Sequence, residues 1–401
     1  MAVAAGLSLG REGPSIQLGG MVGQGVSRIF KRSRMEEHCL ISSGAGAGLA
    51  AAFNAPMASV MFTMEVMHKS LSAVVLLPTL VAAITSTFVA RMFFGRQTIF
   101  AIPKMPFVEV DTLPQLLFLG VFTGLAGFIF NKVMLSGGKF YQAKFFKSNF
   151  RRYLFPLLLT IPVGFILPDI MGGGDVVVEH LVAGHATLQL VVIVLLAKLL
   201  FTMLSACSGV PGGSLQPMLV MGALCGYLYG LVTISLGIVE PAYLMNCIVF
   251  GMAGFFAAAV QAPLTGILLV LELTGSFNHL VAVALVTLFS YSVAAFCKGQ
   301  PIYDVMLEKF LAGESTQENL IQLAERRNIM EMPVESGSSV EGKTIAQVTW
   351  PGDALIVAVK RGEHDIIPNG QTTLVAGDYL YIVANINAAL EVRNLFKKKK
   401  I

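Results

Sequence analysis

Long stretches without a single Asp, Glu, Lys or Arg are the feature that most restricts how this chain can fold. They cover residues 39–64, 70–90, 199–239 and 241–271. Each is long enough for a membrane-spanning helix, since a helix needs about 20 residues to cross the hydrocarbon core. With 55% hydrophobic and 13% charged residues, an aqueous globule would leave too much apolar surface in water. The sequence therefore predicts a protein whose first partner is a lipid bilayer.

Clusters of Gly and Pro interrupt these apolar runs. The strings SGAGAGLAAAFNAP, SGVPGGSLQP and AGFFAAAVQAP each place helix-breaking residues inside an apolar run. Backbone groups freed by such breaks must face protein or a water-filled cavity, because lipid offers no hydrogen-bond partners. This pattern is typical of transporters. No cleavable signal peptide is expected, since the first basic residue, Arg11, follows the small-residue stretch and does not precede an apolar core.

The apolar part of the chain contains an internal repeat. Pro14, Gly19 and Gly23 recur 203 positions later as Pro217, Gly222 and Gly226. Asn54, Ala55, Pro56 and Glu65 are matched 207 positions later by Gln261, Ala262, Pro263 and Glu272. Duplicated halves with matching broken helices favour an inverted-repeat transporter with its site near the midplane. The predicted fold class is an all-α polytopic membrane protein with inverted repeats and broken helices, plus a small α+β cytoplasmic domain.

The distribution of charge divides the chain. Of its 52 charged residues, 24 lie in the last 99 positions. We expect a membrane domain at residues 1–313, a linker at 314–329, and a soluble domain at 330–401 with strand-like alternation in runs such as ALIVAVK. Basic runs at 31–34 and 144–152 fit cytoplasmic anchors, so no nucleic-acid partner is expected. The five cysteines show no paired spacing and predict neither disulfides nor a metal cluster.

A carboxylate stands at the first predicted broken helix. The string LSLGREGPSIQLGG places Glu12 just before Pro14, and proline favours the first turn of a helix. Free N–H groups and the positive dipole end there attract anions, so a halide is expected to bind when protonation or movement withdraws Glu12. The second copy opens a helix at Pro217, with Gly212 and Gly213 exposing amides. The alternative is that Glu12 is a capping carboxylate without a transport role.

The motifs GREGP, AAFNAP, GVPGGSLQP, QAPLTGILLVLE and GQPIY occur in an order that resembles the ClC family of chloride channels and proton-coupled antiporters, over residues 1–313. The resemblance implies a homodimer of the cell membrane, with Glu12 as the gating residue. It also implies that chloride is held by Gly13, Gly213, Ser214, Leu215 and Tyr303. Taken alone, an intramembrane Tyr303 is more typical of a packed residue with one hydrogen bond. Chloride is the expected transported ion, and neither a cofactor nor a metal is expected.

Three features depart from the family pattern. The chain lacks the helices before GREGP that carry a Gly-Ser-Gly-Ile-Pro-type motif, so a serine ligand is missing; we expect a fragment with a late start, or a partner that supplies those helices. Leu215 stands where the family commonly has phenylalanine, and we expect the smaller leucine to loosen the packing beside the ion. Val66 stands where the antiporters carry a second glutamate, which argues against tight proton coupling. Glu65, beside it, is expected to cap or pair near the membrane edge, and proton transfer through it is the alternative.

Residues 330–398 resemble the C-terminal regulatory domain of potassium-transport subunits, the TrkA-C or RCK-C type. The resemblance rests on a Gly-Lys opening, an Ile-Pro turn and a Gly-Asp-Tyr-Leu strand entry. It implies that such domains pair and bind a small regulator such as a cyclic dinucleotide, whose identity the sequence leaves open. Glu363, His364 and Asp365 are expected to form a charged loop and no metal site.

The expected function is chloride transport through a pore gated by Glu12 and regulated by the cytoplasmic tail. Proton-coupled chloride antiport is the alternative within the same family. An enzyme is not expected, because the sequence has no nucleophile with a nearby His, no HExxH motif and no phosphate loop. A regulatory or structural subunit that does not conduct is the alternative of another class, because of the missing helices.

Overall fold

The computed structural model forms two compact units, Met1–Met306 and Leu307–Ile401. It describes residues 3–95, 100, 102, 105–108, 112–143, 146, 148–184, 186–275, 277–313, 328–334, 337–352, 354–362, 364–384, 388, 391, 392, 395 and 396. Most of the predicted linker, at residues 314–327, and Glu363 of the predicted charged loop lie outside the described residues.

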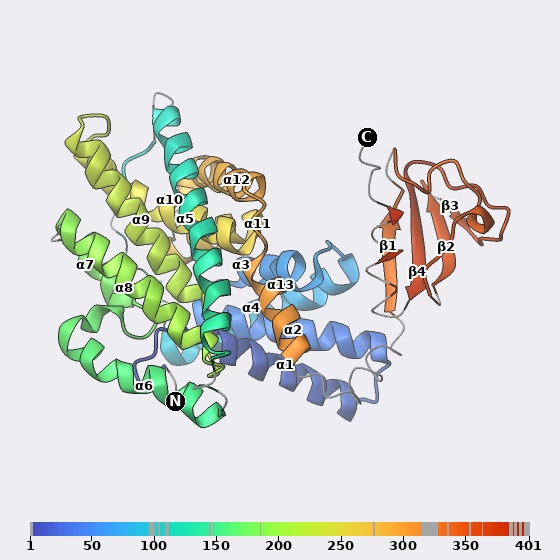
Figure 1. Cartoon of the computed structure of the whole chain (residues 1–401), viewed down its shortest axis with the longest axis horizontal. Coiled ribbons are helices and arrows are strands. Elements are labelled where there is room, and N and C mark those ends of the chain that lie inside the picture. The colour runs from blue at the N-terminus through green and yellow to red at the C-terminus, as the bar shows by residue number, and fades with distance from the viewer. Residues whose placement is uncertain are drawn as a thin grey trace. The chain divides into compact units, whose positions relative to one another are not determined.

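Helices build the first unit, and α5 runs through most of its height (Figure 1). The α-helices are α1 Glu12–Ile29, α2 Arg34–Phe53, α3 Pro56–Phe62, α4 Ala73–Phe94, α5 Leu113–Phe140, α6 Asn149–Ile166, α7 Asp175–Val182, α8 Leu188–Cys207, α9 Leu215–Ser235, α10 Leu244–Val260, α11 Pro263–Thr274, α12 Leu280–Phe296 and α13 Ile302–Gly313. A π-helix, η1 Thr63–His68, extends α3, and the 3-10 helices η4 Pro168–Ile170, η5 Pro241–Tyr243 and η6 Phe277–His279 are short connections.

Six helices of the described chain are long and apolar enough to cross a membrane. They are Ala73–Phe94, Pro114–Phe140, Leu188–Cys207, Leu215–Ser235, Pro241–Val260 and Phe277–Phe296. The outward side of α4 exposes large apolar side chains such as Leu77, Val81 and Phe88, which suits contact with lipid. By contrast, α9 and α10 are buried along most of their length and form the centre of the unit.

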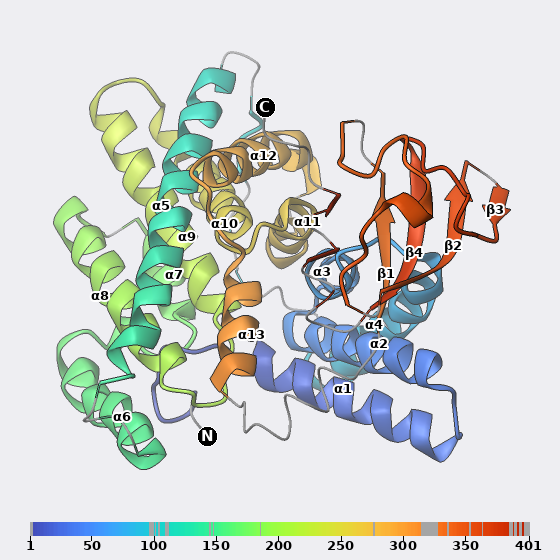
Figure 2. The same cartoon turned by 45° about the vertical axis from the view of Figure 1, so that its right-hand side comes forward.

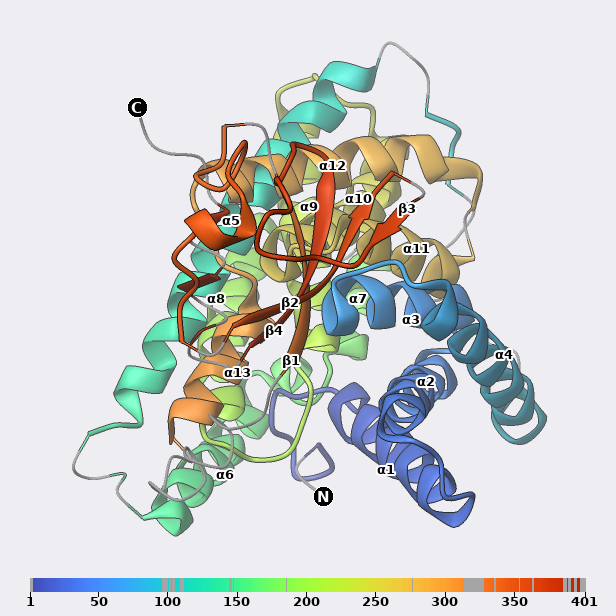
Figure 3. The same ribbon diagram turned by 90° about the vertical axis from the view of Figure 1, so that its right-hand side faces the viewer.

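The two copies of the repeat pack alike. Helices α1 and α2 lie side by side (Figures 2 and 3), and α9 and α10 form the matching pair. A Cβ added to Gly23 would lie 2.1 Å from the carbonyl oxygen of Leu40, and one added to Gly226 would lie 2.0 Å from that of Cys247. Both glycines are therefore required by the same close approach of two helix backbones. The repeated glycines reflect helix packing and not composition alone.

Helices α3 and α11 show how the copies are oriented. Glu65, which follows α3, accepts hydrogen bonds from the first-turn amides of α11, and Glu272 of α11 accepts them from the first-turn amides of α3. These two glutamates are repeat mates. Each copy thus provides a carboxylate that caps a helix of the other copy. Such a reciprocal contact defines a local twofold axis across two antiparallel helices. The copies are inverted relative to each other, and the predicted all-α membrane fold with inverted repeats and broken helices is confirmed.

The second unit contains a four-stranded antiparallel sheet in the order β1-β4-β2-β3, as Figure 1 shows. Its elements are β1 Asn328–Pro333, β2 Leu355–Arg361, β3 His364–Ile366, β4 Asp378–Ala384 and the short helix η7 Ile345–Gln347. The prediction of a charged loop is wrong for His364 and Asp365, which pair with β2 as part of β3. The central strands bury Val359, Leu380 and Ile382. Arg361 Nε and Nη2 donate to the two carboxylate oxygens of buried Asp378, at 2.7 and 2.8 Å, so a bidentate ion pair joins β2 to the start of β4.

Candidate functional site

Glu12 lies at the point where the two copies meet. It is the first residue of α1 and only 2% exposed. Its Oε1 accepts hydrogen bonds from the backbone N–H groups of Leu215 and Gln216, at 2.7 and 3.2 Å. These amides belong to the first turn of α9, whose N-cap residue, Ser214, provides no side-chain cap. The carboxylate of one copy therefore occupies the anion-attracting helix end of the other.

Two glycines make room for this carboxylate. Gly10 and Gly213 form an antiparallel bridge with N–H to C=O distances of 2.7 and 3.0 Å. A Cβ at Gly10 would lie 1.8 Å from Glu12 Oε2, and a Cβ at Gly213 would lie 2.2 Å from Oε1. Among the described residues, the buried Oε2 has no hydrogen-bond donor. The pocket is thus shaped for a negatively charged group and holds it largely by backbone N–H groups.

The remaining predicted chloride ligands surround the same point. The Tyr303 side chain, in the first turn of α13, is half-buried and interacts electrostatically with Glu12 and Ser214. Its ring packs edge-on against that of Phe62, with the ring centroids 6.0 Å apart. A Cβ at Gly13 would lie 3.0 Å from the backbone nitrogen of Gly213, so α1 begins against the loop before α9. The structure therefore brings together the residues predicted from the sequence as gate and ligands.

Glu65 and Val66 lie side by side in η1 but make different contacts. Glu65 accepts from Leu264 N at 3.2 Å and from both the N and Oγ1 of Thr265 at 2.7 and 2.8 Å, which is a capping position on α11. Val66 lines a cavity of about 130 Å³ that Tyr303 also borders. The apolar residue at the position of the antiporters' second glutamate therefore faces the space next to the predicted chloride site.

Lys198, a charged residue inside an apolar run, was not among the site residues predicted from the sequence. It is fully buried in α8, and its Nζ donates to the carbonyl oxygens of Ile170 and Gly172, both at 2.9 Å. The same loop leads to Asp175, whose carboxylate accepts from the Gln216 side chain. Lys198 thus anchors the loop that abuts the first turn of α9. The signal was available, because a single charge inside an apolar span is functional by default.

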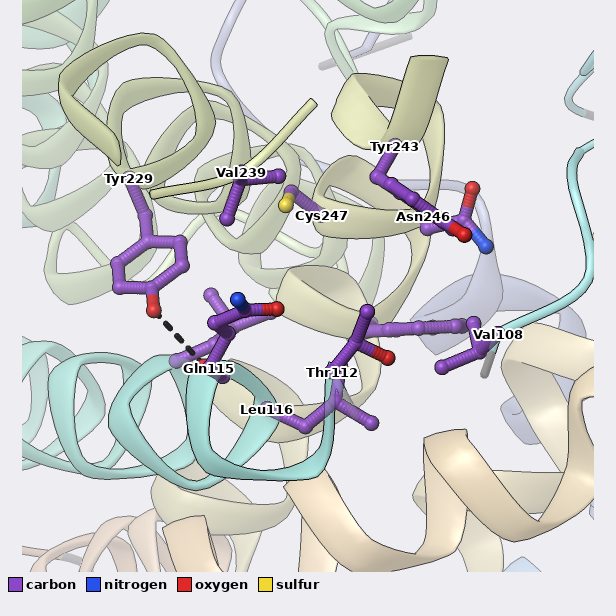
Figure 4. Close-up of a pocket in the computed structure, with 11 residues that line it drawn as sticks. Val108, Thr112, Gln115, Leu116, Tyr229, Val239, Tyr243, Asn246 and Cys247 are labelled. Carbon is purple, nitrogen blue, oxygen red and sulfur yellow. Dashed lines mark hydrogen bonds between the residues drawn. The ribbon is translucent and has the colours of Figure 1, made fainter. Parts of the chain in front are cut away.

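A separate small pocket lies between α5, α9 and α10 (Figure 4). Its volume is about 20 Å³, which is room for roughly one water molecule. Tyr229 closes one side by donating its hydroxyl to the carbonyl oxygen of Gln115 at 2.8 Å, and Cys247 and Val239 add apolar surface. No charged side chain lines it among the described residues, and it shares no residue with the Glu12 site.

The fold and the site together define a class: membrane transport proteins with two inverted repeats whose broken helices end at a buried anion-attracting centre. The sequence model of the voltage gated chloride channel family matches residues 1–295, and the chain belongs to that family. A TrkA-C domain matches residues 329–397.

Curated relatives and solved structures agree with this assignment. An H(+)/Cl(-) exchange transporter, ClcA, of Vibrio campbellii is 34% identical over 327 residues, covering 79% of this chain and 69% of the relative. The crystal structure of a slow cyanobacterial Cl-/H+ antiporter superposes with a TM-score of 0.73 at 30% identity, covering 78% and 74%. A CLC-type fluoride/proton antiporter, 23% identical with a TM-score of 0.62 over 72% and 71%, shares the fold.

Proposed function

We propose that the chain transports chloride across the membrane along a path that Glu12 closes. The observation that carries this proposal is the buried Glu12 carboxylate on the amides of Leu215 and Gln216. A carboxylate at a helix N-terminus is the closest analogue that a protein offers for a bound anion. When Glu12 is protonated or swings away, both N–H groups become free, and chloride takes the place of Oε1.

The ligands of such a site suit a monovalent ion that must leave again. Backbone dipoles together with the hydroxyl groups of Ser214 and Tyr303 hold chloride less tightly than a fixed cation in direct contact would. We therefore propose selectivity for chloride, bromide and nitrate over sulfate. Leu215, which is 1% exposed, contributes its amide to the site and an aliphatic side chain to the hydrophobic core.

Proton-coupled exchange is the second candidate, because the ClcA relative is named as an H(+)/Cl(-) exchange transporter. Against tight coupling stands Val66, which presents no titratable group to the cavity beside Tyr303. We propose weak coupling or none. A chloride gradient across vesicles should then drive little proton movement, whereas a fixed proton-to-chloride ratio in the parent protein would establish antiport.

Chloride efflux from liposomes tests the transport proposal. Vesicles that contain the protein and are loaded with potassium chloride should release chloride when valinomycin relieves the electrical imbalance. Efflux equal to that of loaded vesicles without protein would favour the non-conducting subunit. Glu12→Gln and Glu12→Ala should make efflux less dependent on pH, because neither side chain carries a charge that competes with chloride. If Glu12→Gln behaves like the parent at both acid and neutral pH, Glu12 does not gate the path.

We further propose that the TrkA-C domain is cytoplasmic, pairs with that of a second copy, and modulates transport without forming the path. This rests on its own hydrophobic core and its own compact unit. Truncation after Gly313, which retains α13, should change the rate or its response to nucleotides by at most about 150-fold, the range of coupling free energies between sites. Complete loss of efflux from a folded dimeric truncation would contradict this division of labour.

A further inference from the structure

The cavity beside the proposed chloride site carries an unusual set of charges. Its lining includes Glu65, Val66, Lys69, Gln261, Tyr303 and Asp304, contributed by η1, α13 and the end of α10. Tyr303 borders both this cavity and the Glu12 site. An anion that reaches Tyr303 from this side therefore passes the charged groups of the lining.

One ion pair crosses the exposed end of the cavity. Lys69 Nζ lies 2.5 Å from Asp304 Oδ2, and the two side chains are 57% and 32% exposed. Lys69 directly follows η1 and adopts a left-handed backbone conformation with φ 57°, which ends the helix. Asp304 is the residue after Tyr303 in α13. The pair thus joins the end of η1 to the helix that carries the tyrosine.

The charges on this lining oppose anion entry as long as the pair is closed. Glu65 is bound to three donors of α11, and the charge of Lys69 is countered by Asp304. The lining residues named above therefore carry one net negative charge and no uncompensated cation. Narrow clefts focus such fields and change the local concentration of an ion by large factors.

We infer that the Lys69–Asp304 pair is an electrostatic latch that sets how readily anions reach Tyr303 from this side. With the latch closed, Asp304 neutralises Lys69 and the lining repels chloride. When α13 moves or Asp304 is neutralised, Lys69 becomes a free cation at the entrance and draws anions toward the site. This inference rests on the proposed chloride transport, and it assigns a rate-determining role to two residues that do not touch the ion.

A thiol probe measures the field in the cavity without requiring transport. Val66→Cys places the probe on the lining, and its modification by an anionic and a cationic methanethiosulfonate reagent gives a ratio of rates; the parent protein supplies the background from the native cysteines. One unit charge about 6 Å away in water changes each rate about threefold in opposite directions, so the ratio changes about tenfold. Asp304→Asn should raise the anionic-to-cationic ratio by that factor, and Lys69→Gln should lower it.

The double exchange Lys69→Asp with Asp304→Lys restores an ion pair and should return the ratio to within about twofold of the Val66→Cys parent. Lys31→Gln is the matched control, since Lys31 is also exposed and left-handed, with φ 49°, but lies at the end of α1. It should leave the ratio unchanged. Chloride efflux should rise in Asp304→Asn and fall in Lys69→Gln, and both effects should shrink in 1 M salt, where the Debye length is about 3 Å.

The outcomes separate the latch from the transport proposal. A ratio that is equal in Asp304→Asn, Lys69→Gln and the Val66→Cys parent overturns the latch, whether or not the protein transports chloride. A shifted ratio with unchanged efflux also overturns it, because the field then does not set the rate. Absent efflux in the parent, with the ratio shifted as expected, refutes the proposed transport and leaves the field of the pair established.

Discussion

Substituting the repeat mates Glu65 and Glu272 tests whether Glu65 is a helix cap or a proton carrier. Both carboxylates accept backbone N–H groups from the first turn of the opposite broken helix: Glu65 from α11, and Glu272 from Met57 and Ala58 of α3 at 3.0 and 2.8 Å. Only Glu65 also lines the cavity next to Tyr303. Glu272 therefore provides a control that accepts the equivalent pair of first-turn backbone N–H groups, lacks the added hydrogen bond that Glu65 accepts from Thr265 Oγ1, and has no place in that cavity.

The size of the effect follows from the hydrogen bonds. Glu→Gln keeps the shape and one acceptor oxygen at either position, but it removes the charge and turns an NH2 group toward one backbone N–H. A hydrogen bond to a charged group contributes about 1.5–3 kcal/mol, so each substitution should cost roughly 2 kcal/mol. For a unit of this size that corresponds to a fall of roughly 4 °C or less in unfolding temperature. If both residues are caps, the two substitutions should cost similar amounts.

The assay compares stability with coupling in the same preparations. We expect Glu65→Gln and Glu272→Gln to lower the unfolding temperature in detergent alike and to leave the number of protons moved per chloride unchanged. A Glu65→Gln protein as stable as the parent, with altered proton movement, would show that Glu65 carries protons and that its hydrogen bonds to α11 are incidental.

Three further predictions concern other parts of the chain. Lys198→Met leaves the buried carbonyls of Ile170 and Gly172 without their donor, at about 1–3 kcal/mol each, so it should lower the unfolding temperature more than Lys139→Met at an exposed position. Tyr303→Phe should weaken chloride binding by about 0.5–1.5 kcal/mol in calorimetric titration; an unchanged isotherm removes its hydroxyl from the site. In the tail, the hydrogen bonds from Arg361 hold the pKa of Asp378 below its ordinary value of 3.8. The pair therefore stabilises the domain above pH 3.8, and this contribution is lost as the pH falls through the lowered pKa. Urea unfolding followed by fluorescence of the single Trp, which lies in the tail, should show this acid loss in the parent and not in Asp378→Asn.

Backbone requirements account for most of what the sequence predicted correctly. Gly23 and Gly226 are needed wherever two helix backbones approach closely, and Pro14 and Pro217 both lie in the first turn of a helix. Such demands are local, so they leave the same short strings in both copies. The predicted start of the second helix, at Pro217, is two residues late, since α9 begins at Leu215. The first helix likewise begins two residues before its proline, at Glu12.

Contacts between distant side chains could not be predicted in the same way. The acceptors of Lys198 are backbone carbonyls, which any residue supplies. The amino-acid sequence therefore identifies the lysine as unusual but does not identify its partners. The pairing of Lys69 with Asp304 joins positions 235 apart, and neither residue belongs to a motif. Exposed charges are common, and it is the cavity lined by both residues that gives the pair its significance.

The inverted repeat explains why a carboxylate and an anion-binding helix end face each other at one point. Gly10 and Gly213 are repeat mates that bond to each other, so the local twofold axis passes between them. Two residues further on, the mate of Glu12 is Leu215, and the Glu12 carboxylate accepts from the amide of that mate. In a symmetric duplicate, both copies would present an acid or both would present only amides. Loss of symmetry at this single position leaves one acid opposite one free helix end, which is the minimum arrangement for a charged group to compete with an anion for the same N–H groups.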